Sequence, residues 1–356
     1  MGAPLRIGVL DGDDIGLEIV PAAVEVARAA AARHNLDIDW QPLPIGRRAL
    51  DSHGHTLPPT TMEALHRLDG WILGPIGHRA YPKQPNSVNP HPILRKDFDL
   101  FANVRPTRSY PGIGCLHQDV DLVIVRENNE GFQPDRNMIA GSGEFRPNDD
   151  ITLSVRVITR KASYRVAKAA LELARRRRKH MTFVHKDTVF KLGCGMFVEE
   201  CRRAAAEYPD VEVDDVIVDT MAMRLVRDPQ SFDVVVTTNM FGDILSDEAA
   251  GIVGGLGMAP GLCIGAGRIA MAQATHGSAP DIAGKGVANP YSMIESTRML
   301  LEFLGDSRER PEAQAAAASI SRALTAALAD PAARTRDVRG TGNTATFTQA
   351  VIRNLG

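Results

Sequence analysis

Short apolar runs alternate along the chain with longer segments in which apolar residues recur at helical spacing. Leu5–Leu10 and Phe232–Thr238 are rich in aliphatic and β-branched residues, which predicts strands buried on both faces. Leu17–Arg33 carries apolar residues at every third or fourth position, which predicts a helix with one buried face. Strands that alternate with helices in this way indicate an α/β protein with a largely parallel sheet.

The same patterns predict further elements along the chain. Trp71–Gly77 is predicted to be a strand that runs into a glycine-rich turn, and Ile151–Thr159 alternates as a strand does. The remaining predicted strands are Asp37–Gln41, Met181–Lys186 and Val216–Asp219, and the remaining helices are Thr60–Leu68, Lys161–Lys179 and Pro311–Leu328.

Length and charge exclude several classes of protein. The 356 residues are enough for two domains, and the net charge of −2 gives no reason to expect nucleic acid or an anionic membrane as a partner. The four cysteines lack metal-ligand spacing, and no apolar run approaches twenty residues. We therefore expect a cytoplasmic protein with reduced thiols.

Two carboxylates follow the predicted strand Phe232–Thr238. Asp243 and Asp247 are four residues apart, so on a helix they lie on one face, one turn from each other. Such a pair suits a divalent cation that prefers oxygen ligands, Mg²⁺ or Mn²⁺. The alternative is a helix start whose acidic residues lie near the positive end of the dipole.

The longer string Asn239–Gly251, followed by the glycines of Gly254–Gly257, resembles the signature of the β-decarboxylating dehydrogenases. This family includes isocitrate, homoisocitrate, 3-isopropylmalate and tartrate dehydrogenases. The resemblance extends from Leu10 to Phe347 and implies a two-domain fold of the isocitrate/isopropylmalate dehydrogenase type. The chain has no Gly-x-Gly-x-x-Gly string, so a standard Rossmann fold is not expected.

The resemblance also implies roles for charged residues elsewhere in the chain. Asp219 stands twenty-four residues before Asp243, at the spacing of a third metal ligand, and Lys186 matches the catalytic lysine. In the family this lysine reaches across a dimer into the other subunit's site. Three arginines match positions that hold the carboxylates of a malate-type 2-hydroxy acid: Arg95, Arg105 and Arg126.

The segment before Arg95 is expected to decide which substrate is used. Ser87 and Asn89 resemble a pair with which isocitrate dehydrogenases bind a third carboxylate, although the spacing to Arg95 is longer here. No apolar pocket for an isopropyl group is evident in Pro90–Pro92. The choice among isocitrate, homoisocitrate, isopropylmalate and tartrate stays open.

A loop near the C-terminal end resembles the family's cofactor loop, and its expected contacts are His276, Gly277, Ser278, Ala279, Asp281, Ile282 and Asn289. Asp281 would accept hydrogen bonds from both hydroxyls of the adenosine ribose and repel a 2′-phosphate, so NAD is expected rather than NADP. The opening loop also lies near the cofactor in the family. Here Asp14 replaces a glycine, which costs some backbone strain if that position needs φ > 0.

Gln133 stands where the family carries a tyrosine that is taken to protonate the enol left by CO₂ loss. An amide cannot act as an acid, so Gln133 can only orient a water or an oxyanion. One alternative is therefore an enzyme with an altered last step. A second is a non-catalytic or regulatory relative that binds substrate or nucleotide without turnover.

The resemblance implies a discontinuous first domain, residues 1–104 plus 256–356, and an inserted second domain, residues 105–255. An arm at about residues 128–158 is expected to clasp the partner subunit of a homodimer. The active site is expected to be shared between the subunits.

Overall fold

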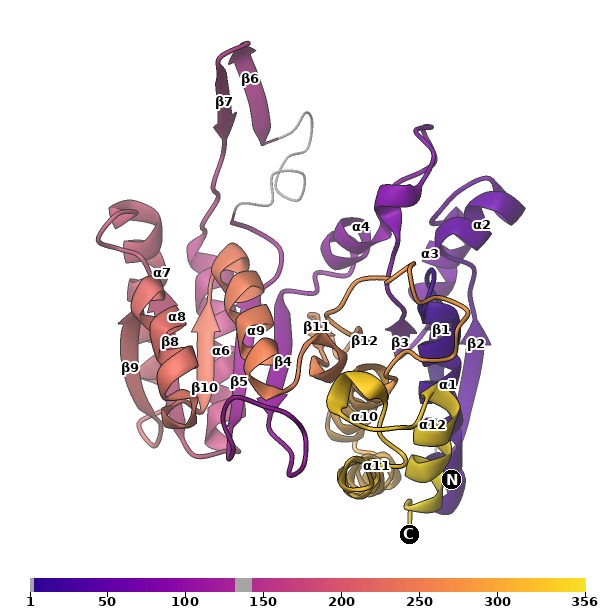
Figure 1. Ribbon diagram of the computed structural model, residues 1–356. Helices are drawn as coiled ribbons and strands as arrows, with labels where there is room; N and C mark the ends of the chain where they lie inside the picture. Colours follow the sequence, from indigo (N-terminus) through magenta and orange to yellow (C-terminus); the bar gives the residue numbers. More distant parts are fainter. Residues whose placement is uncertain (1–2, 132–142) are drawn as a thin grey trace. The chain divides into compact units, whose positions relative to one another are not determined.

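The computed structural model describes residues 3–131 and 143–356. The chain divides into two compact units (Figure 1). Unit 1 consists of Met1–His91, Tyr110–Gln118 and Val253–Gly356, and unit 2 of Pro92–Ser109 and Asp119–Ile252. Both units are discontinuous in sequence. The domain bounds given above, at residues 104 and 256, stay a prediction.

Unit 1 has its strands in the order β2-β1-β3-β12-β11. β1 is parallel to β2 and β3, β12 is parallel to β3, and only β11 runs antiparallel to its neighbour. The strands are β1 (Leu5–Leu10), β2 (Ile38–Pro42), β3 (Gly70–Leu73), β11 (Leu262–Ile264) and β12 (Ala270–Ala272). The helices are α1 (Gly16–Arg33), α2 (Gly46–His53), α3 (Pro59–Leu65), α10 (Tyr291–Ser307), α11 (Pro311–Ala329) and α12 (Thr344–Arg353).

The core of unit 1 explains why these segments form these elements. α1 buries the apolar stripe that its periodicity predicted, and it packs against α10, α11 and α12. β3 is buried along its whole length, with Trp71 fully enclosed. Short 3₁₀ turns at His78–Ala80, Leu256–Met258 and Arg336–Val338 connect the elements.

Unit 2 has its strands in the order β4-β5-β10-β8-β9. β5, β10, β8 and β9 are parallel, and β4 runs antiparallel to β5. The strands are β4 (Ala102–Arg108), β5 (Asp121–Glu127), β8 (His180–His185), β9 (Glu212–Ile217) and β10 (Val234–Thr237). The helices are α4 (Pro90–Asp97), which begins at the boundary with unit 1, α6 (Arg160–Arg175), α7 (Lys191–Ala205), α8 (Val218–Arg227) and α9 (Asn239–Val253). A 3₁₀ turn covers Pro229–Ser231.

An antiparallel hairpin of β6 (Glu144–Asn148) and β7 (Ile151–Ser154) projects from the rest of unit 2 (Figure 1). Every residue of both strands is exposed, including Phe145, Ile151 and Leu153. The hairpin falls in the region expected to form an arm.

One prediction about local structure was wrong. Asp219 does not end a strand: β9 stops at Ile217, and Asp219 lies in the first turn of α8, where the helix dipole favours a carboxylate. α6 ends at Arg175, which pairs with Asp210, and Arg177 pairs with the buried Asp233.

No helix within residues 3–131 and 143–356 is long and apolar enough to cross a bilayer.

Candidate active site

Arginines and aspartates meet in unit 2 where α9 lies beside β4 and β5. Asp243 and Asp247 lie one turn apart on α9, as predicted from their spacing. Arg105 Nη1 on β4 lies 3.2 Å from Asp243 Oδ1 and 3.7 Å from Asp247 Oδ1. Arg126 Nη1, from β5, forms an ion pair with the same Asp243 oxygen. Both arginines are buried, whereas both aspartates are half-exposed.

Neighbouring polar side chains fix the orientation of both guanidinium groups. Asn239 Oδ1 accepts hydrogen bonds from Arg126 Nε at 3.0 Å and from Nη2 at 2.6 Å. Ser246 Oγ lies 2.7 Å from Arg105 Nη1, and Asn103 Oδ1 accepts from Arg105 Nε at 3.4 Å. A guanidinium held in this way presents its remaining N–H groups in fixed directions, as carboxylate recognition requires.

The two aspartates have pKa values shifted in opposite directions. Burial alone would raise the pKa of Asp243, but the guanidinium groups of Arg126 and Arg105 hold it below its usual range. Burial raises the pKa of Asp247 above its usual value although Arg105 lies beside it, and the charge of Asp243 adds to the rise. A divalent cation would favour the charged form of both carboxylates, so this donor pair fits Mg²⁺ or Mn²⁺.

Arg95, the third predicted arginine, is buried in α4 of unit 2. Its charge contributes to the lowered pKa of Asp243, after those of Arg126 and Arg105. All three predicted arginines therefore act on one carboxylate.

Lys186 and Asp219 form a second charged pair in unit 2. Lys186 directly follows β8, and its Nζ forms an ion pair with Asp219 Oδ1. The hydrogen bond from Lys186 lowers the pKa of Asp219. Asp219 is 66% exposed, so its carboxylate faces outward from the chain.

A single chain does not bring the three predicted metal ligands together. Among the described residues, no group of three His, Cys, Asp or Glu side chains is placed to hold a metal ion. Asp219 pairs with Lys186, while Asp243 pairs with Arg105 and Arg126. Within one chain, the charged partners of Asp219 and of the α9 aspartates are therefore different.

The predicted substrate-specificity residues Ser87 and Asn89 lie just before α4. Asn89 Oδ1 accepts a hydrogen bond from the backbone N–H of His91 at 3.2 Å, which is a turn at the helix start. The buried Ser87 Oγ has no hydrogen-bond partner in the part of the chain that the structure describes. The ring of His91 lies 2.7 Å from the amide of Gln273.

The predicted cofactor loop borders a cavity of about 560 Å³ in unit 1. Five of its seven predicted residues line this cavity, together with Ile15 of the opening loop: His276, Gly277, Ala279, Ile282 and Asn289. Ser278 and Asp281 do not. Ser278 is buried and its carbonyl accepts a hydrogen bond from Ile15 N at 3.1 Å, whereas Asp281 is exposed.

The polar groups of this cavity fit a nucleotide base. Burial lowers the pKa of His276, which favours the neutral ring, and its Nε2 is buried with no partner among the described residues. Asn289 is held by Asp337, to which its amide donates at 3.0 Å. An apolar wall with one free ring nitrogen and an oriented amide suits a flat heterocycle.

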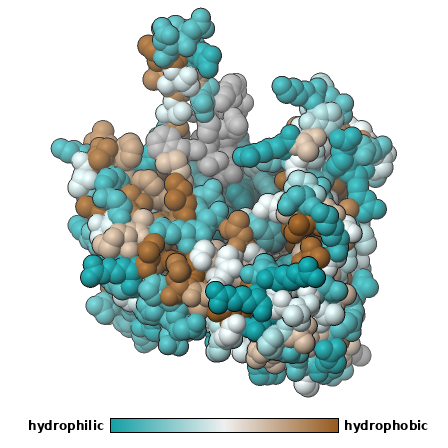
Figure 2. Space-filling view, viewed as in Figure 1, coloured by the Kyte–Doolittle hydropathy of each residue, from teal (hydrophilic) through white to brown (hydrophobic). Residues whose placement is uncertain are grey.

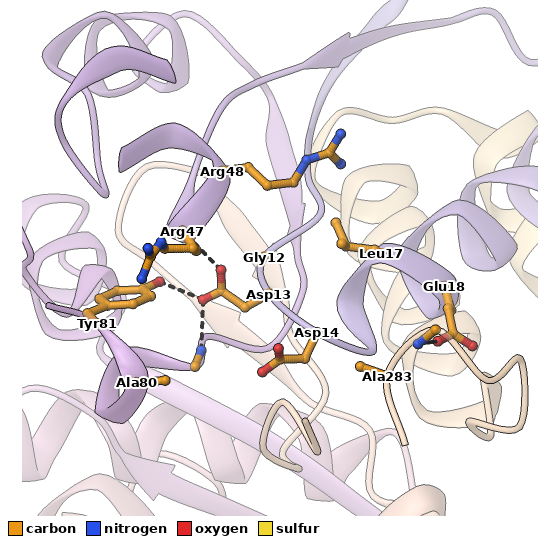
Figure 3. A pocket seen from close by; sticks show the side chains of 12 residues that line it. Gly12, Asp13, Asp14, Leu17, Glu18, Arg47, Arg48, Ala80, Tyr81 and Ala283 are labelled. Carbon is orange, nitrogen blue, oxygen red and sulfur yellow. Dashed lines mark hydrogen bonds between the residues drawn. The ribbon is translucent and has the colours of Figure 1, made fainter. Parts of the chain in front are cut away.

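A second cavity of unit 1, about 440 Å³, was not predicted from the sequence (Figure 3). It is organised by the buried carboxylate of Asp13, which accepts hydrogen bonds from Arg47 N at 2.7 Å, Gly77 N at 2.8 Å and Tyr81 Oη at 2.6 Å. Burial, followed by the bond to Asp13, raises the pKa of Tyr81. The family resemblance drew attention to this loop and to Asp14, but not to the part that Asp13 plays in it.

Gln133, the predicted departure in the protonation step, lies outside the described residues, as do the neighbouring positions 132–142.

Comparison with known proteins gives one consistent result. The model of the isocitrate/isopropylmalate dehydrogenase family matches residues 6–351. The chain is 41% identical over 316 residues to the 3-isopropylmalate dehydrogenase of Archaeoglobus fulgidus, which covers 87% of this chain and 90% of that protein. It is 39% identical over 351 residues to the isocitrate/homoisocitrate dehydrogenase of Thermus thermophilus, with 98% of each covered. The crystal structure of isocitrate dehydrogenase from Methylococcus capsulatus is similar with a TM-score of 0.87, at 38% identity and with 99% of each chain covered.

Proposed function

Because the chain belongs to the isocitrate/isopropylmalate dehydrogenase family, we propose that it oxidises and decarboxylates a 3-substituted malate-type 2-hydroxy acid. The observation that carries the proposal is the cluster of Arg105, Arg126, Asp243 and Asp247. Buried guanidinium groups beside a pair of metal-binding carboxylates are what an anionic hydroxy acid and a divalent cation require. The cofactors proposed are NAD and Mg²⁺ or Mn²⁺.

The side chains of unit 2 would divide the chemistry between them. Arg95, Arg105 and Arg126 would hold the substrate's carboxylates, since a guanidinium matches a carboxylate with two parallel N–H donors. The Lys186–Asp219 pair would relay the proton of the substrate hydroxyl as hydride passes to NAD: Lys186 would first release its own proton to solvent by way of Asp219 and then, as a neutral amine, accept the hydroxyl proton. A bound divalent ion supplies polarisation of the new carbonyl group.

The cofactor would occupy unit 1. The base would lie in the cavity lined by Ile15 and Ile282, with His276 Nε2 and the Asn289 amide as polar contacts. Asp281, on the exposed part of the loop, would take the ribose hydroxyls and repel a 2′-phosphate, which supports NAD over NADP. The four cysteines are free thiols, which supports a reducing compartment such as the cytoplasm.

The partner proposed for the chain is a second copy of itself. Unit 2 exposes apolar side chains near Lys186, along α8 and along α9: Val189, Leu192, Met223, Val226 and Ile244. Figure 2 shows hydrophobic surface over this part of unit 2 and on the β6–β7 hairpin. Apolar surface of this extent marks a contact with another chain. A homodimer would also bring Asp219 and Lys186 of one copy to Asp243 and Asp247 of the other.

Mixing two inactive variants tests this shared site. Lys186→Met and Asp243→Asn each remove one half of the site, so either homodimer should be nearly inactive. In a mixed dimer one site carries both changes and the other carries neither. If the variants exchange subunits freely, half of the dimers are mixed, so about a quarter of the wild-type activity should return. NADH formation with Mn²⁺ and a panel of 3-substituted malates is the assay.

A second mixture provides the control. Lys186→Met mixed with Asp219→Asn removes two groups from the same side of the site, so no activity should return. Recovery in that mixture, or none in the first, would contradict the shared site. If the unaltered protein binds NADH but turns over no member of the panel, the non-catalytic alternative is favoured. Gln133→Tyr tests an altered last step, since it should then raise turnover.

A further inference from the structure

Asp13 and Asp14 are adjacent in sequence and line the same cavity, but their carboxylates differ in burial and in hydrogen bonding (Figure 3). The carboxylate of Asp13 is buried and accepts three hydrogen bonds. The carboxylate of Asp14 is partly exposed and has no hydrogen-bond partner within residues 3–131 and 143–356. Its backbone has φ = 51°, in the left-handed region. Aspartate tolerates this region better than most residues, but glycine is the residue that fits it without cost.

The neighbours of Asp14 leave room for its side chain. A Cβ atom on Gly77 would lie 3.0 Å from Asp14 Oδ2 and 3.1 Å from Ser278 Oγ. The absence of a side chain at Gly77 therefore creates the space in which the Asp14 carboxylate and the Ser278 hydroxyl approach the same point. The backbone carbonyl of Asp14 accepts a hydrogen bond from Leu17 N at 3.2 Å, but its carboxylate has no such structural role, and strain that persists there points to a ligand for the side chain.

Asp14 and the next residue line different cavities. Ile15 lines the cavity of about 560 Å³ with Ala279 and Ile282, and Asp14 lines the cavity of about 440 Å³ with Ala283 and Gly284. The backbone bond from Ile15 N to Ser278 O ties the opening loop to the cofactor loop between them. A dinucleotide whose base lies against Ile15 and which extends past Ser278 meets the Asp14 carboxylate next.

We infer that Asp14 is a further cofactor-contacting residue, whose carboxylate accepts hydrogen bonds from the hydroxyl groups of the dinucleotide's second ribose, the one farther from the base at Ile15. This assignment rests on the proposed function. A carboxylate only accepts hydrogen bonds, so it binds hydroxyl groups well and repels phosphate. The cavity carries charges of both signs, since Asp13 and Glu18 line it together with Arg48 and with Arg47, which is paired with Asp51.

Asp14→Gly and Asp14→Asn separate this role from a structural one. Asp14→Gly removes the strain and the acceptor together, so the melting temperature should stay level or rise while NADH binding weakens. The expected loss is about 10-fold in Kd, the size of one hydrogen bond to a charged group. Asp14→Asn keeps one acceptor oxygen and should fall between Asp14→Gly and the unaltered protein. Titration of NADH by fluorescence and thermal unfolding of the full chain give both quantities.

Asn35→Gly is the matched control, because Asn35 has φ = 53° and lies exposed after α1. It should keep the melting temperature level or raise it, as Asp14→Gly does, and leave the Kd for NADH unchanged. AMP provides a second check: it carries the base, the first ribose and one phosphate but lacks the second ribose of the dinucleotide, so Asp14→Gly should leave its Kd unchanged.

Three results would overturn the assignment. If Asp14→Gly binds NADH as tightly as the unaltered protein, or more tightly, the carboxylate makes no favourable contact. If AMP loses affinity to the same extent as NADH, the change has damaged the base cavity instead. If the unaltered protein does not bind NADH, the proposed function fails and this assignment fails with it.

Discussion

Adding a single methyl group at Gly242 on α9 should change the stability of the protein little but reduce its activity strongly. A Cβ atom there would lie 2.7 Å from both Cβ and Cγ of Arg126. Ordinary contacts of this kind begin at 3.4 Å. In Gly242→Ala, α9 must therefore move away from β5 by roughly 0.7 Å, since the neighbour is the root of a buried side chain and cannot rotate away.

The expected stability change is small because two effects oppose each other. Forcing a methyl group into a packed contact costs about 1–3 kcal/mol. Alanine is favoured over glycine inside a helix by about 1 kcal/mol. The free energy of unfolding should therefore fall by roughly 0–2 kcal/mol.

The expected change in activity is much larger. α9 carries Asp243 and Asp247, while β5 carries Arg126, so the displacement changes the distances inside the candidate active site. A misplacement near 1 Å can reduce a rate by about 100-fold. We expect kcat/KM to fall by about 10- to 100-fold and Mn²⁺ to bind more weakly.

Urea unfolding, NADH formation and Mn²⁺ titration by electron paramagnetic resonance measure the three quantities. Gly195→Ala is the matched control: Gly195 lies in α7 and an added Cβ would meet nothing within 4 Å. It should gain about 0.5–1 kcal/mol of stability and keep its activity. A Gly242→Ala protein with kcat/KM and Mn²⁺ affinity near those of the unaltered protein would refute the reasoning.

Three further predictions concern pH, cofactor and assembly. Burial raises the pKa of Glu130 to about 7 from an ordinary 4.5, although hydrogen bonds from Thr159 oppose the rise. The folded chain therefore binds this proton more tightly than the unfolded chain does. Stability from this group should be present below pH 4.5 and be lost between pH 4.5 and 7, and urea unfolding across that range should show a flatter profile for Glu130→Gln. Asp281→Lys should raise the ratio of NADPH to NADH affinity at least about 10-fold in fluorescence titrations, because a repulsive charge becomes an attractive one; an unchanged ratio would exclude Asp281 from the ribose contact. Ile244→Asp places a charge on the exposed apolar face of α9. The variant should sediment as a monomer and have little activity, because a buried unpaired charge would prevent association. An active monomer would exclude a shared site.

The elements with strong periodicity were predictable from the sequence. α1 and α11 lie within one residue of their predicted bounds, and the aspartates of α9 share a face because the 3.6-residue repeat requires it. The α/β class and the family followed from the same segments and are confirmed by the family match over residues 6–351.

Features that depend on distant contacts were not predictable in the same way. The boundary between β9 and α8 was misplaced because Val216–Val218 suits a strand as well as the start of a helix. The role of Asp13 depends on donors at positions 47, 77 and 81, which only the folded chain brings together. The sequence identified Asp219 as a candidate metal ligand. It could not show that, within one chain, Asp219 pairs with Lys186 and belongs to no three-ligand group among the described residues.

The β6–β7 hairpin has a thermodynamic consequence of its own. A two-stranded ribbon is marginally stable in water by itself, and the side chains of Phe145, Ile151 and Leu153 are about half exposed in the described part of unit 2. Its order should therefore depend on protein concentration if another copy of the chain covers these side chains. Slow hydrogen exchange at the amides of Glu144–Ser154 would then indicate that two chains have associated. This measurement needs no substrate, so it can also be made on variants that have lost all turnover.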